Sequence, residues 1–273
     1  FQVNRLCAPR GKIVITGHGL DEMFFGYIRN LAAGIAAERG IGAIDPRGEP
    51  FGQLPPDTRA FFTGWEEYLQ SMVDSEGAAI TWRYFQKLCR MDVFNSTPAE
   101  DGLPRRMRRL ALDTYDTLAR EAPSLGEFMF AAETRLQLPA LLQMEDRASM
   151  RYTVEARVPF CNPSVFAVAK SIPWPWKLHG GVPKGLIRDA FCDLVPPAVL
   201  SRKEKVGRPV PLARWLDEPA GRPFREQLES KRELFQDLTS CDLIGQAGLR
   251  PPDRLLWGLL SLARWIDVHR VSV

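Results

Sequence analysis

The chain has 273 residues, of which 45% are hydrophobic and 25% charged, and its net charge is +3. This length suffices for one large domain or two small ones with a substantial core, and the composition is that of an ordinary globular protein. The small net charge gives no support for a nucleic-acid partner. No apolar run approaches the roughly 20 residues that span a bilayer, so we expect no membrane partner either.

A short strand and a glycine turn are predicted near the start of the chain. Residues 12–16 form a β-branched run that predicts a buried strand. Residues 17–19, Gly-His-Gly, predict a tight turn, and Asp21 and Glu22 then open a helical pattern. In open α/β sheets, ligands lie at the carboxyl ends of strands, which is where this turn would be.

The remainder of the chain is predicted to be mostly helical. Residues 40–60 predict an irregular loop and residues 201–211 a basic one. Helices are expected near 64–73, 77–90, 105–121, 125–152, 163–171, 184–194, 223–235 and 253–268. Pro139 should start or kink a turn within the helix at 125–152. We find no repeat, no low-complexity tract and no clear linker.

Cysteine and histidine spacing gives no sign of a metal site. The five cysteines are odd in number, scattered and never spaced as CxxC, which argues against a disulfide framework or a zinc site. No pair of the three histidines has the spacing of metal ligands. We therefore expect no metal ligands among the side chains, reduced thiols and a cytoplasmic location.

A charged cluster interrupts the predicted helix at 125–152. Glu145, Asp146 and Arg147 stand in an otherwise apolar stretch. Such charges must be paired or must face a cleft, because burying one unpaired charge costs several kcal/mol. Two interpretations remain open at this point: an internal ion-pair network between helices, and a catalytic role.

A cationic cluster follows Gly180 and Gly181. Lys184 and Arg188 are four positions apart, which predicts that both lie on one helix face. Lysine as a point charge and arginine as a fork are suited to holding phosphate. The alternative is a solvated basic face.

Taken together and in this order, the clusters resemble the synthetase domain of the glutamine-hydrolysing asparagine synthetase family. Residues 16–27 are similar to its glycine strand-turn, which ends in Phe-Gly-Gly-Tyr. Further similarities are to Glu-Asp-Arg-x-Ser-Met and Glu-x-Arg-Val-Pro-Phe, then to Gly-x-x-Lys-x-x-Leu-Arg and Pro-Leu-Ala-Arg-Trp-Leu, at residues 145–150, 155–160, 181–188 and 211–216. The resemblance covers about 11–30 and 136–216.

The resemblance implies an α/β parent fold of the adenine nucleotide alpha-hydrolase-like, ATP pyrophosphatase type. Residues 1–273 would be the C-terminal portion of that domain, mostly α-helical with a short parallel-strand remnant near 12–16. The implied function is that of an ATP-dependent, amide-forming ligase. It would activate aspartate as an acyl-adenylate for attack by ammonia released from glutamine, with Mg²⁺ bridging the phosphates of ATP.

The resemblance also implies roles for individual residues. The expected catalytic residues are His18, Lys184 and Glu145. Contacts to ATP are expected from Thr16, Gly17, Gly19, Asp21 and Arg188. Contacts to the acceptor substrate are expected from Asp146, Lys205 and Arg208, with Arg147 as the structural partner of the two acidic residues.

Two departures from the family pattern shape the alternatives. The family's Ser-Gly-Gly-x-Asp-Ser signature and N-terminal nucleophilic cysteine are absent from the sequence. We therefore expect the upstream PP-loop and glutaminase portions of the same enzyme as partners, with a homodimer as a further candidate. The chain by itself should not bind ATP productively, and a catalytically silent structural module is the alternative of another class.

The second departure is His18, which stands where the family carries Glu. Histidine exchanges protons near neutral pH, so His18 is a candidate general base for an amine nucleophile. This favours, as an alternative, a specialised amidotransferase or a cyclase of the lasso-peptide or β-lactam type. A purely structural role, hydrogen bonding within the turn, is the competing interpretation.

Overall fold

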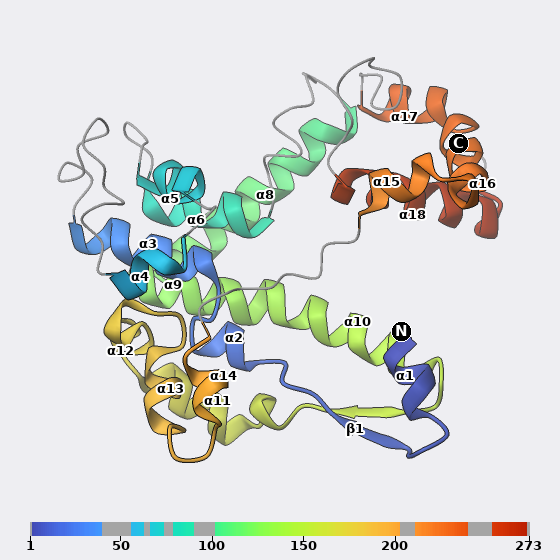
Figure 1. Cartoon of the computed structure of the whole chain (residues 1–273). Helices are drawn as coiled ribbons and strands as arrows, with labels where there is room; N and C mark the ends of the chain where they lie inside the picture. The colour runs from blue at the N-terminus through green and yellow to red at the C-terminus, as the bar shows by residue number, and fades with distance from the viewer. Residues whose placement is uncertain are drawn as a thin grey trace. The chain divides into compact units, whose positions relative to one another are not determined.

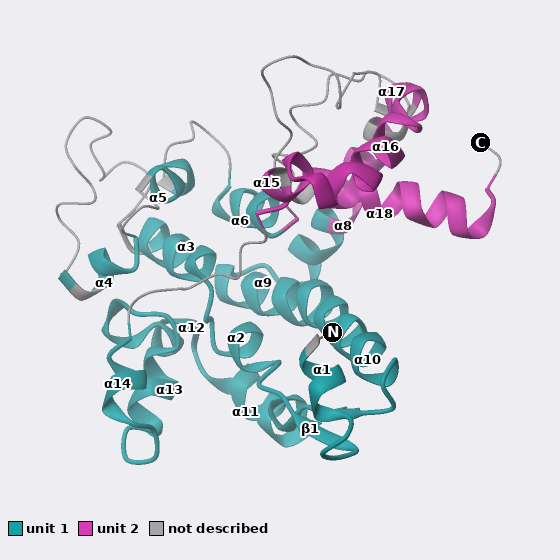
Figure 2. Ribbon diagram, turned by 45° about the vertical axis from the view of Figure 1, so that its right-hand side comes forward, with its two compact units in different colours: residues 1–88, 115–205 teal, residues 89–114, 206–273 magenta. Residues whose placement is uncertain are grey.

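The computed structural model describes residues 2–39, 56–62, 66–73, 79–89, 102–202, 211–239 and 253–271. The chain forms two compact units, each built from two separate stretches (Figure 2). Unit 1 comprises residues 1–88 and 115–205, and unit 2 comprises residues 89–114 and 206–273. The sequence shows no linker because one boundary, at 114/115, lies inside a helix rather than in a loop.

Most of the described chain is α-helical, as expected (Figure 1). The helices of unit 1 are α1 (Gln2–Cys7), α2 (Leu20–Met23), α3 (Ile28–Arg39), α4 (Pro56–Ala60), α5 (Glu66–Val73), α6 (Ile80–Cys89, with its last residue in unit 2), α9 (Leu125–Ala132), α10 (Leu138–Met150), α11 (Pro163–Ser171), α12 (Trp174–Lys177), α13 (Gly185–Ala190) and α14 (Pro197–Leu200). Helix α8 (Gly102–Glu121) contributes to both units. Unit 2 adds α15 (Leu212–Asp217), α16 (Arg222–Glu229), α17 (Arg232–Thr239) and α18 (Asp253–His269).

A small parallel sheet joins two distant parts of unit 1. Strand β1 (Ile13–Ile15) pairs in parallel with β2 (Glu155–Arg157), with Val14 opposite Ala156. The strand near 12–16 is therefore confirmed, but the expectation that it is buried is wrong. Ile13 is 50% exposed and Ile15 77% exposed. Within the described residues the sheet has only these two strands, so they leave much of β1 open to solvent.

Three predicted helices differ in detail from the structure. The pattern that starts at Asp21 is two helices, α2 and α3, because Phe25 adopts a left-handed backbone with φ 57°. The stretch 125–152 is α9, a π-helical turn η1 (Glu133–Gln137) and α10, and Pro139 lies in the first turn of α10, as the Pro139 prediction requires. The stretch 223–235 is divided between α16 and α17.

Part of the predicted loop at 40–60 is helical, because residues 56–60 form α4. Residues 40–55 lie outside the described residues, as do residues 203–210 of the predicted basic loop. The described cysteines Cys7, Cys161 and Cys192 are free thiols.

The interior of unit 1 combines large apolar side chains with one buried polar network. Phe25, Tyr84 and Phe128 are completely buried. The Glu133 carboxylate, also at 0% exposure, accepts two hydrogen bonds of 2.7 Å from the Arg29 guanidinium and one from the Tyr84 hydroxyl. Burial, followed by the Glu133 charge, raises the pKa of Tyr84. The network links α3, α6 and the π-helical turn.

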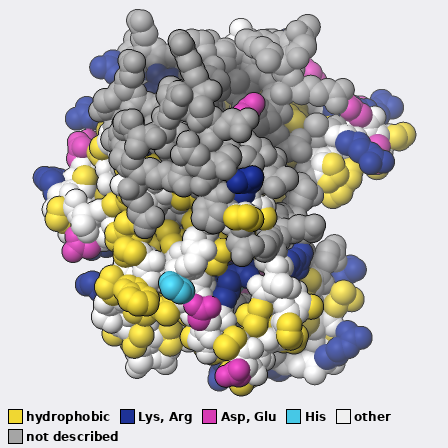
Figure 3. Space-filling model, turned by 60° about the vertical axis from the view of Figure 1, so that its left-hand side comes forward, with side chains coloured by type: hydrophobic (Ala, Val, Ile, Leu, Met, Phe, Trp, Pro, Cys, Tyr) yellow, Lys and Arg dark blue, Asp and Glu magenta, His cyan; other side chains and the backbone are white. Residues whose placement is uncertain are grey.

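Unit 2 has its own apolar core, formed by residues of α15, α16, α17 and α18: Leu212, Leu216, Leu228, Phe235, Leu256, Leu259, Leu260 and Ala263. Other hydrophobic side chains of the chain remain exposed, and on the face drawn in Figure 3 hydrophobic patches lie among Lys and Arg side chains. None of the described helices combines the length and apolar composition that crossing a membrane requires.

Candidate active site

The glycine turn after β1 is held against the segment that follows β2. The Thr16 amide donates a 2.9 Å hydrogen bond to the Arg157 carbonyl, which continues the sheet into the turn. Gly19 has φ +96°, and a Cβ at this position would lie 2.8 Å from the Cys161 Sγ. Glycine at 19 is thus required by both the backbone conformation and the close approach. The structure therefore brings together the glycine turn and the family motif at residues 155–160.

His18 is oriented within this turn by Thr16. The Thr16 hydroxyl and the His18 Nδ1 are 3.0 Å apart. The His18 Nε2 makes no hydrogen bond with the described part of the chain, and the side chain is half-buried. When the Nδ1–H donates to Thr16, the Nε2 lone pair is available to accept a proton from a ligand. Next to His18, Gly17 is open, because a Cβ there would meet nothing within 4 Å.

Glu22 stabilises the glycine turn through its buried side chain. Its carboxylate, 2% exposed, accepts a 2.9 Å hydrogen bond from the Gly19 amide and a second from the Tyr27 hydroxyl. Burial and then the bond to Glu22 raise the pKa of Tyr27, so this phenol stays protonated as a donor. From the sequence, Glu22 was expected only to open a helical pattern; its position three residues after Gly19 was the available signal for this bond.

The break between α2 and α3 places Asp21. The Gly26 amide donates a 2.8 Å hydrogen bond back to the Asp21 carbonyl. A Cβ on Gly26 would lie 1.7 Å from the Asp21 Oδ1, so only glycine leaves room for this carboxylate. The Asp21 carboxylate therefore lies against Gly26, the residue that follows Phe25.

Lys184 meets Asp21 at this break. The Lys184 Nζ lies 2.8 Å from the Asp21 Oδ1, with side-chain exposures of 24% and 38%. The Lys184 amide also donates a 3.3 Å hydrogen bond to the Phe25 carbonyl. The i, i+4 spacing predicted that Lys184 lies on a helix face with Arg188, and this prediction is wrong. Lys184 is instead the N-cap of α13, with a left-handed backbone of φ 57°. This conformation turns Lys184 toward the glycine turn.

Arg188 is occupied by backbone carbonyls. Its guanidinium donates to the carbonyls of Pro183 (3.2 Å), Leu200 and Arg202 (3.3 Å). Burial lowers its pKa. These bonds tie α13 to the end of α14 and engage the nitrogens that a phosphate fork would use. The structure gives Arg188 a positioning task beside Lys184, and its predicted contact to ATP has no support from this geometry.

A cavity of about 280 Å³ adjoins Lys184. Its wall is mostly apolar and includes Leu20, Phe160 and Phe191, while Lys184 and Arg188 supply the cations. The wall therefore draws on residues of three family motifs, at 16–27, 155–160 and 181–188, which border one cavity.

The acidic cluster on α10 is not joined to this cavity by any contact in the described residues. Glu145 is half-buried, and Asp146 and Arg147 are exposed. None of the three side chains forms an ion pair or hydrogen bond with another described residue. The expectation that Arg147 is the partner of Glu145 and Asp146 is therefore wrong, and no ion-pair network links the three to other described residues. Lys205 and Arg208 lie outside the described residues.

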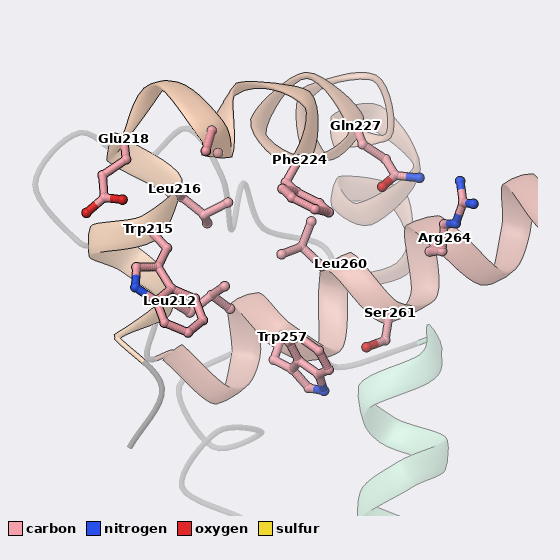
Figure 4. A pocket seen from close by; sticks show the side chains of 12 residues that line it. Leu212, Trp215, Leu216, Glu218, Phe224, Gln227, Trp257, Leu260, Ser261 and Arg264 are labelled. Carbon is pink, nitrogen blue, oxygen red and sulfur yellow. The ribbon is translucent and has the colours of Figure 1, made fainter. Parts of the chain in front are cut away.

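Unit 2 contains a larger, separate groove of about 630 Å³ (Figure 4). Trp215, Trp257 and Phe224 line it from α15, α18 and α16, with Arg264 and Gln227 at one end. The Pro211–Leu216 motif thus belongs to an apolar surface. The described residues show nothing that covers the groove, and its lining has no acid–base pair suited to catalysis.

The residues present fit an anionic ligand better than a bare metal ion. Within the described ranges, no group of three or more His, Cys, Asp or Glu side chains comes together as a metal site would require. Lys184, by contrast, is a partly exposed cation that borders the cavity of about 280 Å³. Such an arrangement suits phosphate oxygens. The fold and these contacts thus define a helix-rich protein with a glycine turn and a partly exposed lysine near it.

Comparison with known proteins identifies the family. Residues 2–267 match the model of the asparagine synthase family, and the chain belongs to this family. It is 41% identical over 227 residues to a putative glutamine-hydrolyzing asparagine synthetase of Mycobacterium bovis, covering 79% of this chain and 32% of the relative. It is 43% identical over 113 residues to glutamine-hydrolyzing asparagine synthetase 1 of Bacillus subtilis, covering 41% of this chain and 18% of the relative. No solved structure gives a significant match. The chain thus spans about a third or less of the curated relatives it matches.

Proposed function

We propose that this chain is part of an ATP-dependent, amide-forming ligase of the asparagine synthase type. The reaction would activate the side-chain carboxylate of aspartate as an acyl-adenylate, which ammonia from glutamine then attacks. The observation that carries the proposal is the 2.8 Å contact of Lys184 with Asp21, because it joins two motifs to which the family resemblance assigns contacts with ATP. The family membership of residues 2–267 supports it independently.

In this proposal, each residue at the turn has a physical task. Lys184 neutralises the charge that develops on the departing pyrophosphate, and the open Gly17 and Thr16 backbone orients the nucleotide. Asp21 holds the Lys184 ammonium in place before the ligand arrives. When bound, ATP with its Mg²⁺ would supply the activating adenylyl group, with pyrophosphate as the leaving group. Because the described residues offer no three-ligand metal cluster, Mg²⁺ would be held mainly by the phosphate oxygens.

Glu145 and Asp146 remain candidates for the acceptor side, since both are accessible and unpaired within the described residues. We propose the adenine nucleotide alpha-hydrolase-like fold for the complete domain, with the PP-loop and glutaminase portions as further parts of the enzyme. The exposed apolar side chains on β1 support this, because a strand with Ile15 at 77% exposure is suited to packing against further structure.

A second candidate function is favoured by one observation. His18 is fixed by Thr16 through Nδ1, while its Nε2 has no partner in the described part of the chain. This is the arrangement of a base that removes a proton from an amine. We therefore keep a specialised amidotransferase or cyclase, acting on an amine other than free ammonia, as the alternative.

A pyrophosphate-release assay on the complete protein tests the proposal. Aspartate, other amino-acid carboxylates and peptide carboxylates are compared, each with glutamine, ammonium or a primary amine as nucleophile. Aspartate-dependent release with asparagine formed from ammonium supports the asparagine synthase type. Release that requires an amine supports the cyclase alternative. The absence of release with every carboxylate would identify a silent structural module and refute the ligase.

A further inference from the structure

One lysine is buried inside unit 1 without a hydrogen bond. Lys177, the last residue of α12, is 2% exposed. Its Nζ lies 4.8 Å from the ring centroid of Phe25 and 4.4 Å from that of Phe130. It makes no hydrogen bond or ion pair with any other described residue. The two aromatic faces attract the cation, each by about 0.5–2 kcal/mol.

These contacts compensate only part of the cost of burial. Taking an ammonium out of water costs several kcal/mol unless an acceptor replaces the lost water. Burial accordingly lowers the pKa of Lys177 to about 8. A buried charge without an acceptor is rare in folded proteins and requires an explanation. The role proposed for Lys184 does not involve Lys177.

Lys177 borders a cavity of about 420 Å³ between α9, the end of α11 and residues 171–174. This volume lies in the range of roughly 300–1,000 Å³ typical of small-molecule sites. Phe130, Phe166 and Trp174 give the cavity an aromatic wall. The described residues lining it differ completely from those of the cavity beside Lys184.

The polar groups that line this cavity are already bonded elsewhere. The Thr134 hydroxyl donates to the Phe130 carbonyl at 2.6 Å, and the Ser171 hydroxyl to the Val168 carbonyl at 2.9 Å. The two acidic residues of the lining also have partners. Glu127 accepts a hydrogen bond from Ser124, and Glu121 forms an ion pair with Arg135. Among the buried described residues of the lining, this leaves Lys177 as the charge that lacks an acceptor.

We infer that this cavity binds a small monocarboxylate with an apolar or aromatic body, whose carboxylate pairs with the Lys177 ammonium. The aromatic wall of Phe166 and Trp174 accommodates the body of the ligand. One buried positive charge without an acceptor calls for one negative charge. The cavity lining carries three cations, Lys177, Lys170 and Arg135, against Glu121 and Glu127, a net charge of +1, so dianionic phosphate is a poorer match than a monocarboxylate.

Phenylacetate is the probe, because it combines one carboxylate with a single ring. Its binding to the 273-residue chain is measured by titration calorimetry, beside the neutral phenylacetamide and inorganic phosphate. The decisive variant is Lys177→Met, which keeps an unbranched side chain between the two rings and favours sulfur–aromatic contact. Lys170→Met is the matched control, because Lys170 lines the same cavity but is exposed. Thermal unfolding of both variants verifies the fold.

Phenylacetate should bind saturably to the wild type, and Lys177→Met should weaken it by at least about tenfold, the equivalent of 1.4 kcal/mol. Phenylacetamide should bind the wild type at least about tenfold more weakly than phenylacetate, and Lys170→Met should bind within about twofold of the wild type. The inference is overturned if phenylacetate shows no saturable binding or binds a folded Lys177→Met as well as the wild type. Equal affinity for phenylacetamide or phosphate overturns the monocarboxylate assignment.

Discussion

Arg29 and Glu133 form a bidentate ion pair inside unit 1, with both nitrogen–oxygen distances at 2.7 Å. The Glu133 side chain is fully buried, and that of Arg29 is 10% exposed. Asn30 adds a further bond of 3.3 Å to the same carboxylate. The pair connects α3 to the π-helical turn before α10. Its role is therefore structural: it holds together elements that neighbour the site.

The first prediction is that Glu133→Ala destabilises the protein by about 3–5 kcal/mol, because it leaves Arg29 buried without its partner. Urea unfolding of the chain measures this. The matched control is Glu121→Ala, which removes an ion pair with side chains 50% and 55% exposed and should cost less than about 1 kcal/mol. Equal losses of unfolding free energy for the two variants would show that burial does not increase the contribution of the Arg29–Glu133 pair to stability.

How much of this was visible in the sequence depends on the range of each interaction. The helix at 163–171 was predicted to the residue, because Asn162 caps it through the Ser164 amide and Pro163 suits its first turn. The start of α10, the helix that carries the acidic cluster, was also indicated by Pro139. These signals are local.

The long-range contacts could not be read in the same way. Nothing near Glu133 marks it as buried, since its partner Arg29 comes from a distant helix. The resemblance assigned the glycine turn, Lys184 and Glu145 to one reaction, and the Lys184–Asp21 contact brings two of these groups together. No contact among the described residues brings Glu145 to them. The backbone of Lys184 and the occupation of Arg188 by carbonyls were missed, because side-chain spacing does not report a left-handed residue.

The second prediction concerns Lys184 in the complete enzyme. Lys184→Ala should lower the rate of pyrophosphate release by about 10²–10³-fold, because a fixed cation at the developing phosphate charge is lost. Its ion pair with Asp21 is partly exposed, so stability should change little. Steady-state kinetics and thermal unfolding measure the two effects. A near-normal rate would remove Lys184 from the mechanism.

The third prediction uses Thr16 to test whether His18 acts chemically. Thr16→Val keeps the shape of the side chain but removes the hydroxyl that holds the His18 Nδ1 at 3.0 Å. If His18 is a base, the turnover number should fall by about tenfold while the KM for ATP stays within about twofold. A purely structural histidine would leave turnover unchanged. Replacing His18 itself by Gln should then produce a larger loss with amine than with ammonium as nucleophile.

The fourth prediction is a rise of stability at alkaline pH that depends on Lys177. Burial lowers its pKa from 10.5 to about 8. Between these values the unfolded chain holds a proton that the folded chain has released, so the free energy of unfolding increases as pH rises through this window. The gain is on the order of 3 kcal/mol, since each pKa unit corresponds to about 1.4 kcal/mol.

Urea unfolding of wild type and Lys177→Met from pH 7 to 10.5 measures this effect as a difference, which cancels the other titrating groups, including Glu127 and Lys170 at the same cavity. The variant should be the more stable protein at pH 7, because it carries no buried charge, and the difference should shrink toward pH 10.5. Saturating phenylacetate should reduce the slope for the wild type, since a bound carboxylate stabilises the charged lysine. A difference that stays constant with pH would mean that Lys177 has an acceptor and an ordinary titration.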